Sequence, residues 1–201
     1  MITLRGVTLR FGEHVVLDGL DLDLAEGCVT ALMGPNGSGK TTLGRLLLGL
    51  AVADVGTIHG LDGRRRAAVF QEDRLCEQLT AVDNVRLVLG RAAARSAVVA
   101  ELGRVGLTGE ELRKPVHKLS GGQRRRVAII RALAAEADLV VLDEPFTGLD
   151  TEAKTRILGY VRERCDGRTV LLITHDRVEA EWFGARVVHL SSAHSSDRST
   201  D

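Results

Sequence analysis

A glycine-rich loop centred on residue 37 restricts the fold of this chain more than any other feature. It consists of Gly34, Pro35, Asn36, Gly37, Ser38, Gly39, Lys40 and Thr41, and Thr42 follows it. The loop matches the pattern G-x-x-x-x-G-K-[ST], whose glycines let successive backbone N–H groups point at phosphate oxygens. The helix that begins near Lys40 adds the positive end of its dipole. We therefore predict a phosphate site, with Lys40 on the β- and γ-phosphates and the Thr41 hydroxyl on Mg²⁺.

An acidic pair follows a second apolar run. Residues 139–142 read Leu-Val-Val-Leu, and Asp143 and Glu144 come directly after them. Ligands of α/β sheets bind beyond the carboxyl ends of the strands, so these carboxylates are expected beside the glycine-rich loop. Alone, the pair could also be the acidic start of a helix. With the loop present, we predict that Asp143 serves Mg²⁺ and that Glu144 polarises a water for attack on the γ-phosphate of ATP.

The spacing of apolar residues predicts the fold class. Residues 2–9 and 15–24 alternate apolar and polar side chains, which indicates half-buried antiparallel strands. Further strands are expected at 28–33, 66–71, 138–142, 169–173 and 185–190, and helices at 41–50, 120–135, 151–164 and 178–183. Residues 72–118 have a helical pattern throughout, and the segment between residues 56 and 66 has no element assigned.

Strands that alternate with helices predict an α/β fold. We expect a P-loop NTPase core with a mainly parallel sheet, an N-terminal antiparallel β-subdomain and a small helical subdomain at about 72–118. Together these make one domain over residues 1–190. The tail, 191–201, is almost entirely polar, and we expect it to be disordered.

Composition excludes several classes of protein. Lys and Arg together number 27, as do Asp and Glu, so the chain lacks the basic excess of a typical nucleic-acid binder. The two arginine runs, 64–66 and 124–126, are expected to be solvated or partner-facing surface. Three widely spaced cysteines form neither a disulfide framework nor a metal-binding pattern, which favours reduced thiols in a cytosolic protein. No signal peptide is apparent, and no apolar run approaches the roughly 20 residues that span a bilayer, so a membrane role would require a partner.

A second helix start carries two glycines. Leu119, Ser120, Gly121, Gly122 and Gln123 stand in sequence just before a helical pattern. Ser120 and Gln123 fit a capping box, but two glycines at a helix start cost stability without adding to the cap. Bare amides at the positive end of a helix dipole form a second anion site.

In this order the motifs resemble those of the ATP-binding cassette (ABC) ATPases, over essentially residues 1–190. Residues 34–42 are similar to the Walker A loop of that family and residues 139–144 to its Walker B strand. Residues 119–123 read LSGGQ, the family signature, without alteration. The combination of signature and Walker A loop is highly specific.

Four further residues take their roles from this resemblance alone. Gln71 falls at the Q-loop glutamine, which senses the metal and the γ-phosphate, and Asp150 ends a segment similar to the D-loop. His175 corresponds to the switch histidine, and Phe11 to an aromatic residue that stacks on adenine. The implied catalytic residues are Glu144, His175 and Gln71, and the implied Mg²⁺ residues are Thr41, Gln71 and Asp143.

The resemblance also implies an assembly. Family members form a head-to-tail dimer in which each ATP lies between one chain's Walker A loop and the other chain's signature. We expect a homodimer, or a heterodimer with a similar ATPase, in the ATP-bound state. The segment 72–118 matches the subdomain that docks a transmembrane permease, which implies a cytoplasmic protein at the inner face of the membrane.

Residues 69–75 resemble the Q-loop region of importers for nitrate, sulfonates and related small solutes, and an importer would also use a solute-binding protein. One alternative is an exporter ATPase. Another is a soluble ABC-family ATPase acting on nucleic acid or ribosomes, which the single cassette and the lack of heptads disfavour. A third is an ATP-gated binding module that does not hydrolyse ATP. Glu144 and His175 argue against it.

Overall fold

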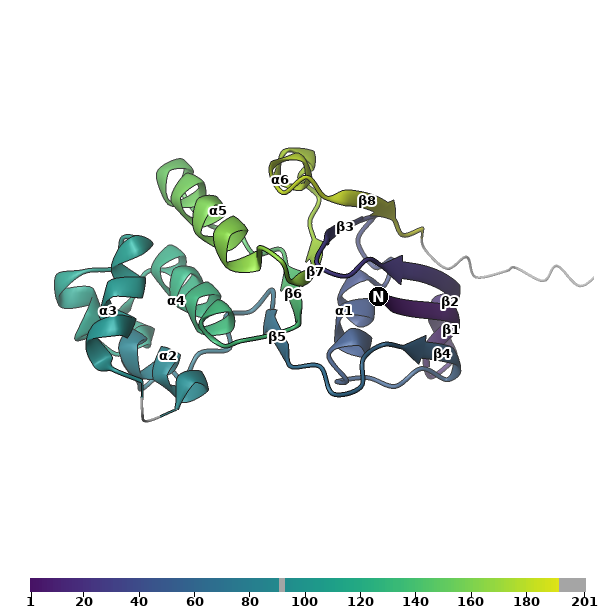
Figure 1. The fold of residues 1–201 in the computed structure, drawn as a ribbon, viewed down its shortest axis with the longest axis horizontal. Coiled ribbons are helices and arrows are strands. Elements are labelled where there is room, and N and C mark those ends of the chain that lie inside the picture. Colours follow the sequence, from purple (N-terminus) through teal and green to yellow (C-terminus); the bar gives the residue numbers. More distant parts are fainter. Residues whose placement is uncertain (91–92, 192–201) are drawn as a thin grey trace, which may run out of the picture.

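Two sheets and a set of helices make up the fold in the computed structural model, which describes residues 1–90 and 93–191 (Figure 1). One sheet is antiparallel, with strand order β2-β1-β4, and the other is parallel, with strand order β5-β6-β7-β3-β8. The antiparallel strands are β1 (Ile2–Phe11), β2 (His14–Leu24) and β4 (Val55–His59). The parallel strands are β3 (Val29–Met33), β5 (Arg66–Val69), β6 (Leu139–Asp143), β7 (Thr169–Ile173) and β8 (Arg186–His189). The predicted α/β architecture is confirmed.

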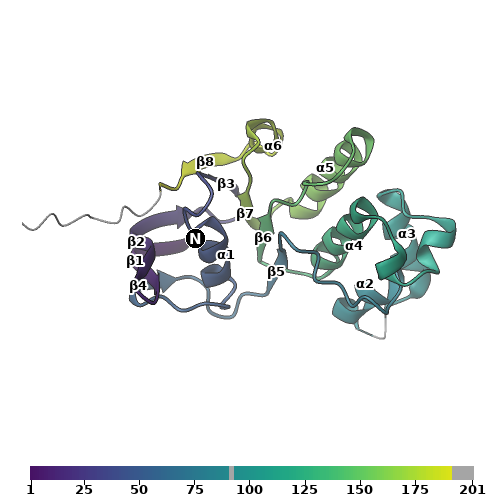
Figure 2. The ribbon, with the colours of Figure 1, turned by 180° about the vertical axis from the view of Figure 1, so that it is seen from behind.

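Helix α1 (Lys40–Leu47) lies between the two sheets (Figures 1 and 2). Its buried Leu43, Leu46 and Leu47 follow the i, i+3, i+4 spacing of an apolar helix face. They share one core with β1 and β2 residues such as Leu4 and with β6 and β7 residues such as Val141. The helix that follows the glycine-rich loop is therefore held firmly against both sheets.

The remaining helices lie on the opposite side of the parallel sheet, where all but the last share a second core with β5, β6 and β7. They are α2 (Ala81–Leu89), α3 (Arg95–Arg104), α4 (Gly121–Ala134), α5 (Thr151–Cys165) and α6 (Arg177–Trp182), with 3₁₀ turns η1 (Gly109–Leu112) and η2 (Val116–Lys118). Ala180 of that last helix packs with Ala31 and Met33 of β3. Within the described residues, no helix combines the length and the hydropathy needed to cross a bilayer.

The continuous helical pattern predicted over 72–118 is wrong at its start. The segment before α2 is irregular, and Thr80 begins the helix by accepting a 3.1 Å hydrogen bond from the Asp83 amide. The Asn84 side chain stabilises the turn before this helix by hydrogen-bonding to the backbone N–H and C=O of Cys76. The strand predicted at 66–71 also ends early, at Val69.

Strand β4 has no counterpart in the sequence-based assignment. It pairs with β1, with Leu4 opposite Ile58. Four of its five residues are exposed, so it lacks the alternation that reveals a strand. The predicted disorder of residues 191–201 lies outside the described residues, apart from Ser191.

The arginine run 124–126 is not simply a surface patch. Arg125 is 4% exposed, and its guanidinium bonds to backbone carbonyls of neighbouring loops. Arg126 donates to the carbonyls of Val105 and Gly106. Buried carbonyls outside sheets and helices need donors, and these arginines supply them.

Candidate active site

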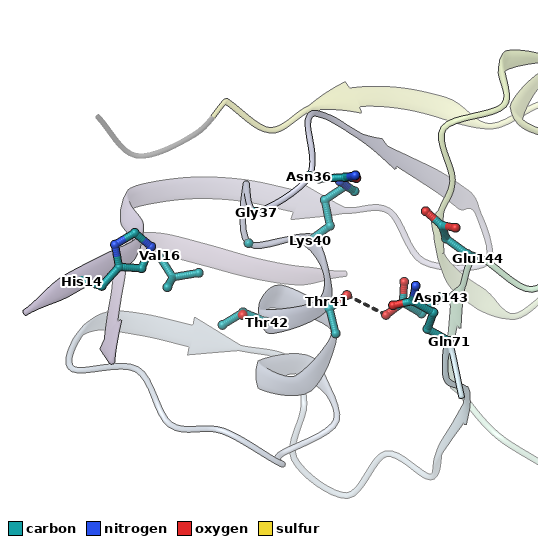
Figure 3. Close-up of a pocket in the computed structure, with 11 residues that line it drawn as sticks. His14, Val16, Asn36, Gly37, Lys40, Thr41, Thr42, Gln71, Asp143 and Glu144 are labelled. Carbon is teal, nitrogen blue, oxygen red and sulfur yellow. Dashed lines mark hydrogen bonds between the residues drawn. The ribbon is translucent and has the colours of Figure 1, made fainter. Parts of the chain in front are cut away.

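A cavity of about 470 Å³ opens where the glycine-rich loop meets the carboxyl end of β6 (Figure 3). Segments far apart in the sequence contribute to it. Its lining residues are His14, Val16, Asn36, Gly37, Gly39, Lys40, Thr41, Thr42, Gln71, Asp143 and Glu144. The sequence predicted most of this set, but not His14 or Val16.

The loop needs glycine for measurable reasons. Gly39 precedes α1 with φ 91°, and a Cβ there would lie 2.8 Å from Cδ2 of Leu17. Gly37, with φ 80°, faces open space, because a Cβ added to it would meet no atom within 4 Å. A side chain at Gly37 would therefore occupy the cavity, and one at Gly39 would displace the loop.

Lys40 currently closes on its own loop. Its Nζ donates to the carbonyls of Gly34 at 2.9 Å and Pro35 at 2.8 Å. The Ser38 hydroxyl is buried without a hydrogen-bond partner among the described residues. Buried hydroxyls normally have a partner. Ser38 does not line the cavity, so the loop offers phosphate the Lys40 cation and the N-terminus of α1.

Thr41 and the acidic pair meet across the cavity. The Thr41 hydroxyl donates a 2.8 Å hydrogen bond to Oδ2 of Asp143. Burial raises the pKa of Asp143, and the charge of Glu144 adds to the rise, although the Thr41 bond opposes it. A nearby cation would oppose both the burial and the Glu144 charge, because a positive charge favours the ionised carboxylate. A hydroxyl and a carboxylate are the oxygen ligands that Mg²⁺ uses.

Glu144 stands on a sharp turn. Its φ is 45°, in the left-handed region, and its amide donates to the Ile173 carbonyl at 2.9 Å. Its carboxylate lies 3.3 Å from Nδ1 of His175 and accepts a 3.3 Å bond from the Thr147 hydroxyl. The structure therefore brings the predicted Glu144 and His175 together, although His175 is exposed and outside the cavity lining.

Phe11 does not line the cavity and is 57% exposed. His14 lines it instead, together with Val16 from the same strand (Figure 3). Phe11 and His14 face each other across the β1–β2 hairpin, so their side chains share one face of the sheet. In the sequence, His14 follows Phe11 by three residues across a turn that contains Gly12. This spacing could have predicted that the two rings lie side by side.

The second glycine-rich helix start lies outside this cavity. Ser120 and Gln123 form the predicted capping box, with bonds of 3.2 Å and 2.9 Å. A Cβ on Gly122 would lie 3.5 Å from the Gly148 carbonyl, so this start and the segment before α5 are neighbours. Asp150 caps α5 by accepting a 2.9 Å bond from the Ala153 amide. Gly121 and Asp150 are exposed on this surface.

Comparison with known proteins gives a consistent result. The family model described as ABC transporter matches residues 17–147. An aliphatic sulfonates import ATP-binding protein of Paraburkholderia xenovorans is 42% identical over 193 residues, which cover 95% of this chain and 77% of the relative. A protein of the same description from Frankia casuarinae is 45% identical over 193 residues. That alignment covers 94% of this chain but 63% of the relative, so the chain spans less than two thirds of that protein's length.

Solved structures agree on the fold. An ATP-binding cassette solved as a dimer in a post-hydrolysis state, bound to ADP and Pi, gives a TM-score of 0.84 at 28% identity. The match covers 96% of this chain and 97% of that one.

Proposed function

The chain belongs to the ABC transporter family of ATPases, and from this premise we propose that it binds Mg²⁺-ATP in the cavity beside Lys40 and hydrolyses it to drive a membrane transporter. The observation that carries the proposal is the bond between Thr41 and Asp143. It joins the phosphate loop to the acidic strand end at one cavity.

The loop residues 34–42 bind the triphosphate. Lys40 exchanges its two carbonyl partners for β- and γ-phosphate oxygens, which are stronger acceptors because they are charged. Thr41, Asp143 and Gln71 hold Mg²⁺, which when bound neutralises charge on the phosphates. Phe11 and His14 offer ring faces to the adenine.

Glu144, which follows β6, is the proposed general base for hydrolysis. Glu144 holds a water and accepts its proton, and Gln71 orients that water against the γ-phosphate. His175, 3.3 Å from the Glu144 carboxylate, steadies that carboxylate and the leaving phosphate. The cavity is open on one side, so this chain alone does not exclude bulk solvent from the site.

A second cassette closes the open side. Ser120, Gly121, Gly122 and Gln123 lie outside their own chain's cavity. The capping box uses the amides of Ser120 and Gln123, so the amides of Gly121 and Gly122 are the ones that face an anion held by another chain. We propose that they bind the γ-phosphate held by a second copy, or by a similar ATPase, with Asp150 at the same interface. ATP then joins the two chains, and hydrolysis releases them.

The transported solute is recognised by other chains. We propose a permease partner that docks on the helical subdomain, at about 72–118, and holds this chain at the cytoplasmic face of the membrane. The sulfonate importers among its relatives, and the 69–75 segment, favour import of small organic anions of the sulfonate type, with a solute-binding protein delivering them.

Phosphate release from ATP by the purified chain tests the activity. We expect turnover that requires Mg²⁺, disappears with EDTA and is lost in Lys40→Ala. If the purified wild-type chain binds ATP but releases no phosphate, with or without the co-purified permease, the chain is an ATP-gated binding module and the proposal is wrong. Uptake of an alkanesulfonate by cells with and without the gene tests the solute separately.

A further inference from the structure

One buried arginine links the two segments that carry the proposed catalytic residues. Arg125 lies on α4, five residues after Ser120, and is 4% exposed. Its guanidinium makes six hydrogen bonds, five to backbone carbonyls and one to a carboxylate. Such a side chain is neither a solvated charge nor a simple ion pair.

Three of these bonds hold the turn that carries Glu144. Nη2 donates to the carbonyls of Asp143 at 3.2 Å and Glu144 at 2.6 Å. Nε donates to the Pro145 carbonyl at 2.9 Å. Glu144 needs this support, because a left-handed φ is strained in a residue other than glycine and persists only when its surroundings impose it.

The other three bonds hold the segment that carries Gln71. Nη1 donates to the carbonyls of Phe70 at 2.6 Å and Gln71 at 3.3 Å. It also pairs with the Asp73 carboxylate at 3.2 Å. Strand β5 ends at Val69, so no sheet bond fixes Gln71. One turn and a half further along α4, Arg131 adds a 3.1 Å bond to the Asp73 carbonyl.

The geometry of arginine suits this task. Its five N–H donors lie in one rigid plane, so carbonyls bound on opposite edges keep a fixed separation. A lysine ammonium presents three donors at a single point and cannot span both segments. The guanidinium therefore sets how far the backbone of Gln71 lies from the backbone of Glu144.

We propose that Arg125 is a positioning residue for ATP hydrolysis. It locks the Gln71 and Glu144 segments to each other and to the helix that begins at Ser120. A shift of that helix on meeting a second copy's ATP would then move both segments of its own site. This inference rests on the proposed function, since it assigns Gln71 and Glu144 to hydrolysis.

Steady-state kinetics of Arg125→Lys test the proposal. We expect kcat to fall between about 10- and 100-fold, because small misplacements of catalytic groups cost that much. KM and the Kd for fluorescent ATP should stay within about twofold of wild type, since the phosphate loop is untouched. Arg124→Lys, one residue away and outside this set of contacts, is the matched control and should keep wild-type turnover.

An unchanged kcat in folded Arg125→Lys overturns the proposal. So does a parallel loss of kcat, ATP affinity and melting temperature, which marks a purely structural residue. If Arg125→Lys does not fold, Asp73→Ala decides, because it removes one partner of Arg125 at the partly exposed edge of the network. It should lower kcat several-fold at constant Kd, and an unchanged kcat overturns the proposal. Failure of the proposed function itself would show differently, as a wild-type chain that releases no phosphate.

Discussion

The Thr41 hydroxyl donates a 2.8 Å hydrogen bond to Oδ2 of Asp143, across 102 residues of sequence. One group lies in the first turn of α1, which follows the glycine-rich loop, and the other ends strand β6. Because both elements are anchored in the same apolar core, the two oxygens are held in place before any ligand arrives. Preorganisation of this kind lowers the cost of assembling a metal site.

The pair predicts a specific magnesium defect. Thr41→Val keeps the shape of the side chain but removes the hydroxyl, so we expect the Mg²⁺ concentration for half-maximal ATPase activity to rise about 10-fold or more. Thr41→Ser keeps the hydroxyl and should stay near wild type. Titration of activity with Mg²⁺ at saturating ATP measures both variants. Equal Mg²⁺ dependence in Thr41→Val and Thr41→Ser would show that the hydroxyl does not serve the metal.

We predict that His14 and Phe11 contribute to binding of the adenine base of ATP. His14→Ala should weaken ATP binding about 5-fold or more, since a ring stacked on a base contributes about 1–3 kcal/mol. Phe11→Ala should have a similar or smaller effect, because Phe11 lies beyond the lining. Inorganic tripolyphosphate has no base, so its affinity should not change in either variant. If both variants bound ATP as wild type does, the base would lie elsewhere.

The sequence predicted the loop, the strand ends and the signature because each depends on local spacing. Residues 34–42 and 139–144 carry their pattern within a few positions, and the structure brings them to one cavity. Strand β4, His14 and Arg125 escaped prediction for the opposite reason. β4 exists through its pairing with β1, and Arg125 is buried because distant loops present carbonyls to it. Such long-range partners leave no periodic signal.

Glu101 predicts a pH dependence of stability. Partial burial alone would raise the pKa of Glu101, but hydrogen bonds from Arg164 and Tyr160 outweigh it and hold the pKa below its ordinary value. A lowered folded-state pKa stabilises the protein above the unfolded value of about 4.3, and this stability is lost as pH falls through the folded value.

Glu101→Gln should therefore lower the melting temperature by a few degrees at pH 7, about 1 kcal/mol after allowance for solvent screening. The gap to wild type should shrink as pH falls below about 4. Glu110→Gln removes an exposed i,i+4 pair with Lys114 and serves as the control. A gap that stayed constant between pH 7 and pH 3.5 would count against the charged pair.

Cys165 should resist thiol reagents in the folded protein. It is 4% exposed, and burial raises its pKa to about 12, so almost none of it is thiolate at pH 8. Cys28 and Cys76 are exposed. Iodoacetamide at pH 8 should label those two in the native protein and all three in urea, as counted by mass spectrometry. Labelling of native Cys165 as fast as Cys28 would contradict the packing of α5 on the sheet.

ATP-dependent dimerisation of Glu144→Gln tests the central claim most directly. Loss of the general base should slow hydrolysis about 100-fold or more while leaving the phosphate loop and the signature intact. Light scattering should therefore show a monomer without nucleotide and a stable dimer with Mg²⁺-ATP, and Ser120→Arg in the same background should abolish the dimer. A Glu144→Gln variant that hydrolyses ATP at the wild-type rate, or that remains monomeric with ATP bound, would contradict a site completed by a second copy.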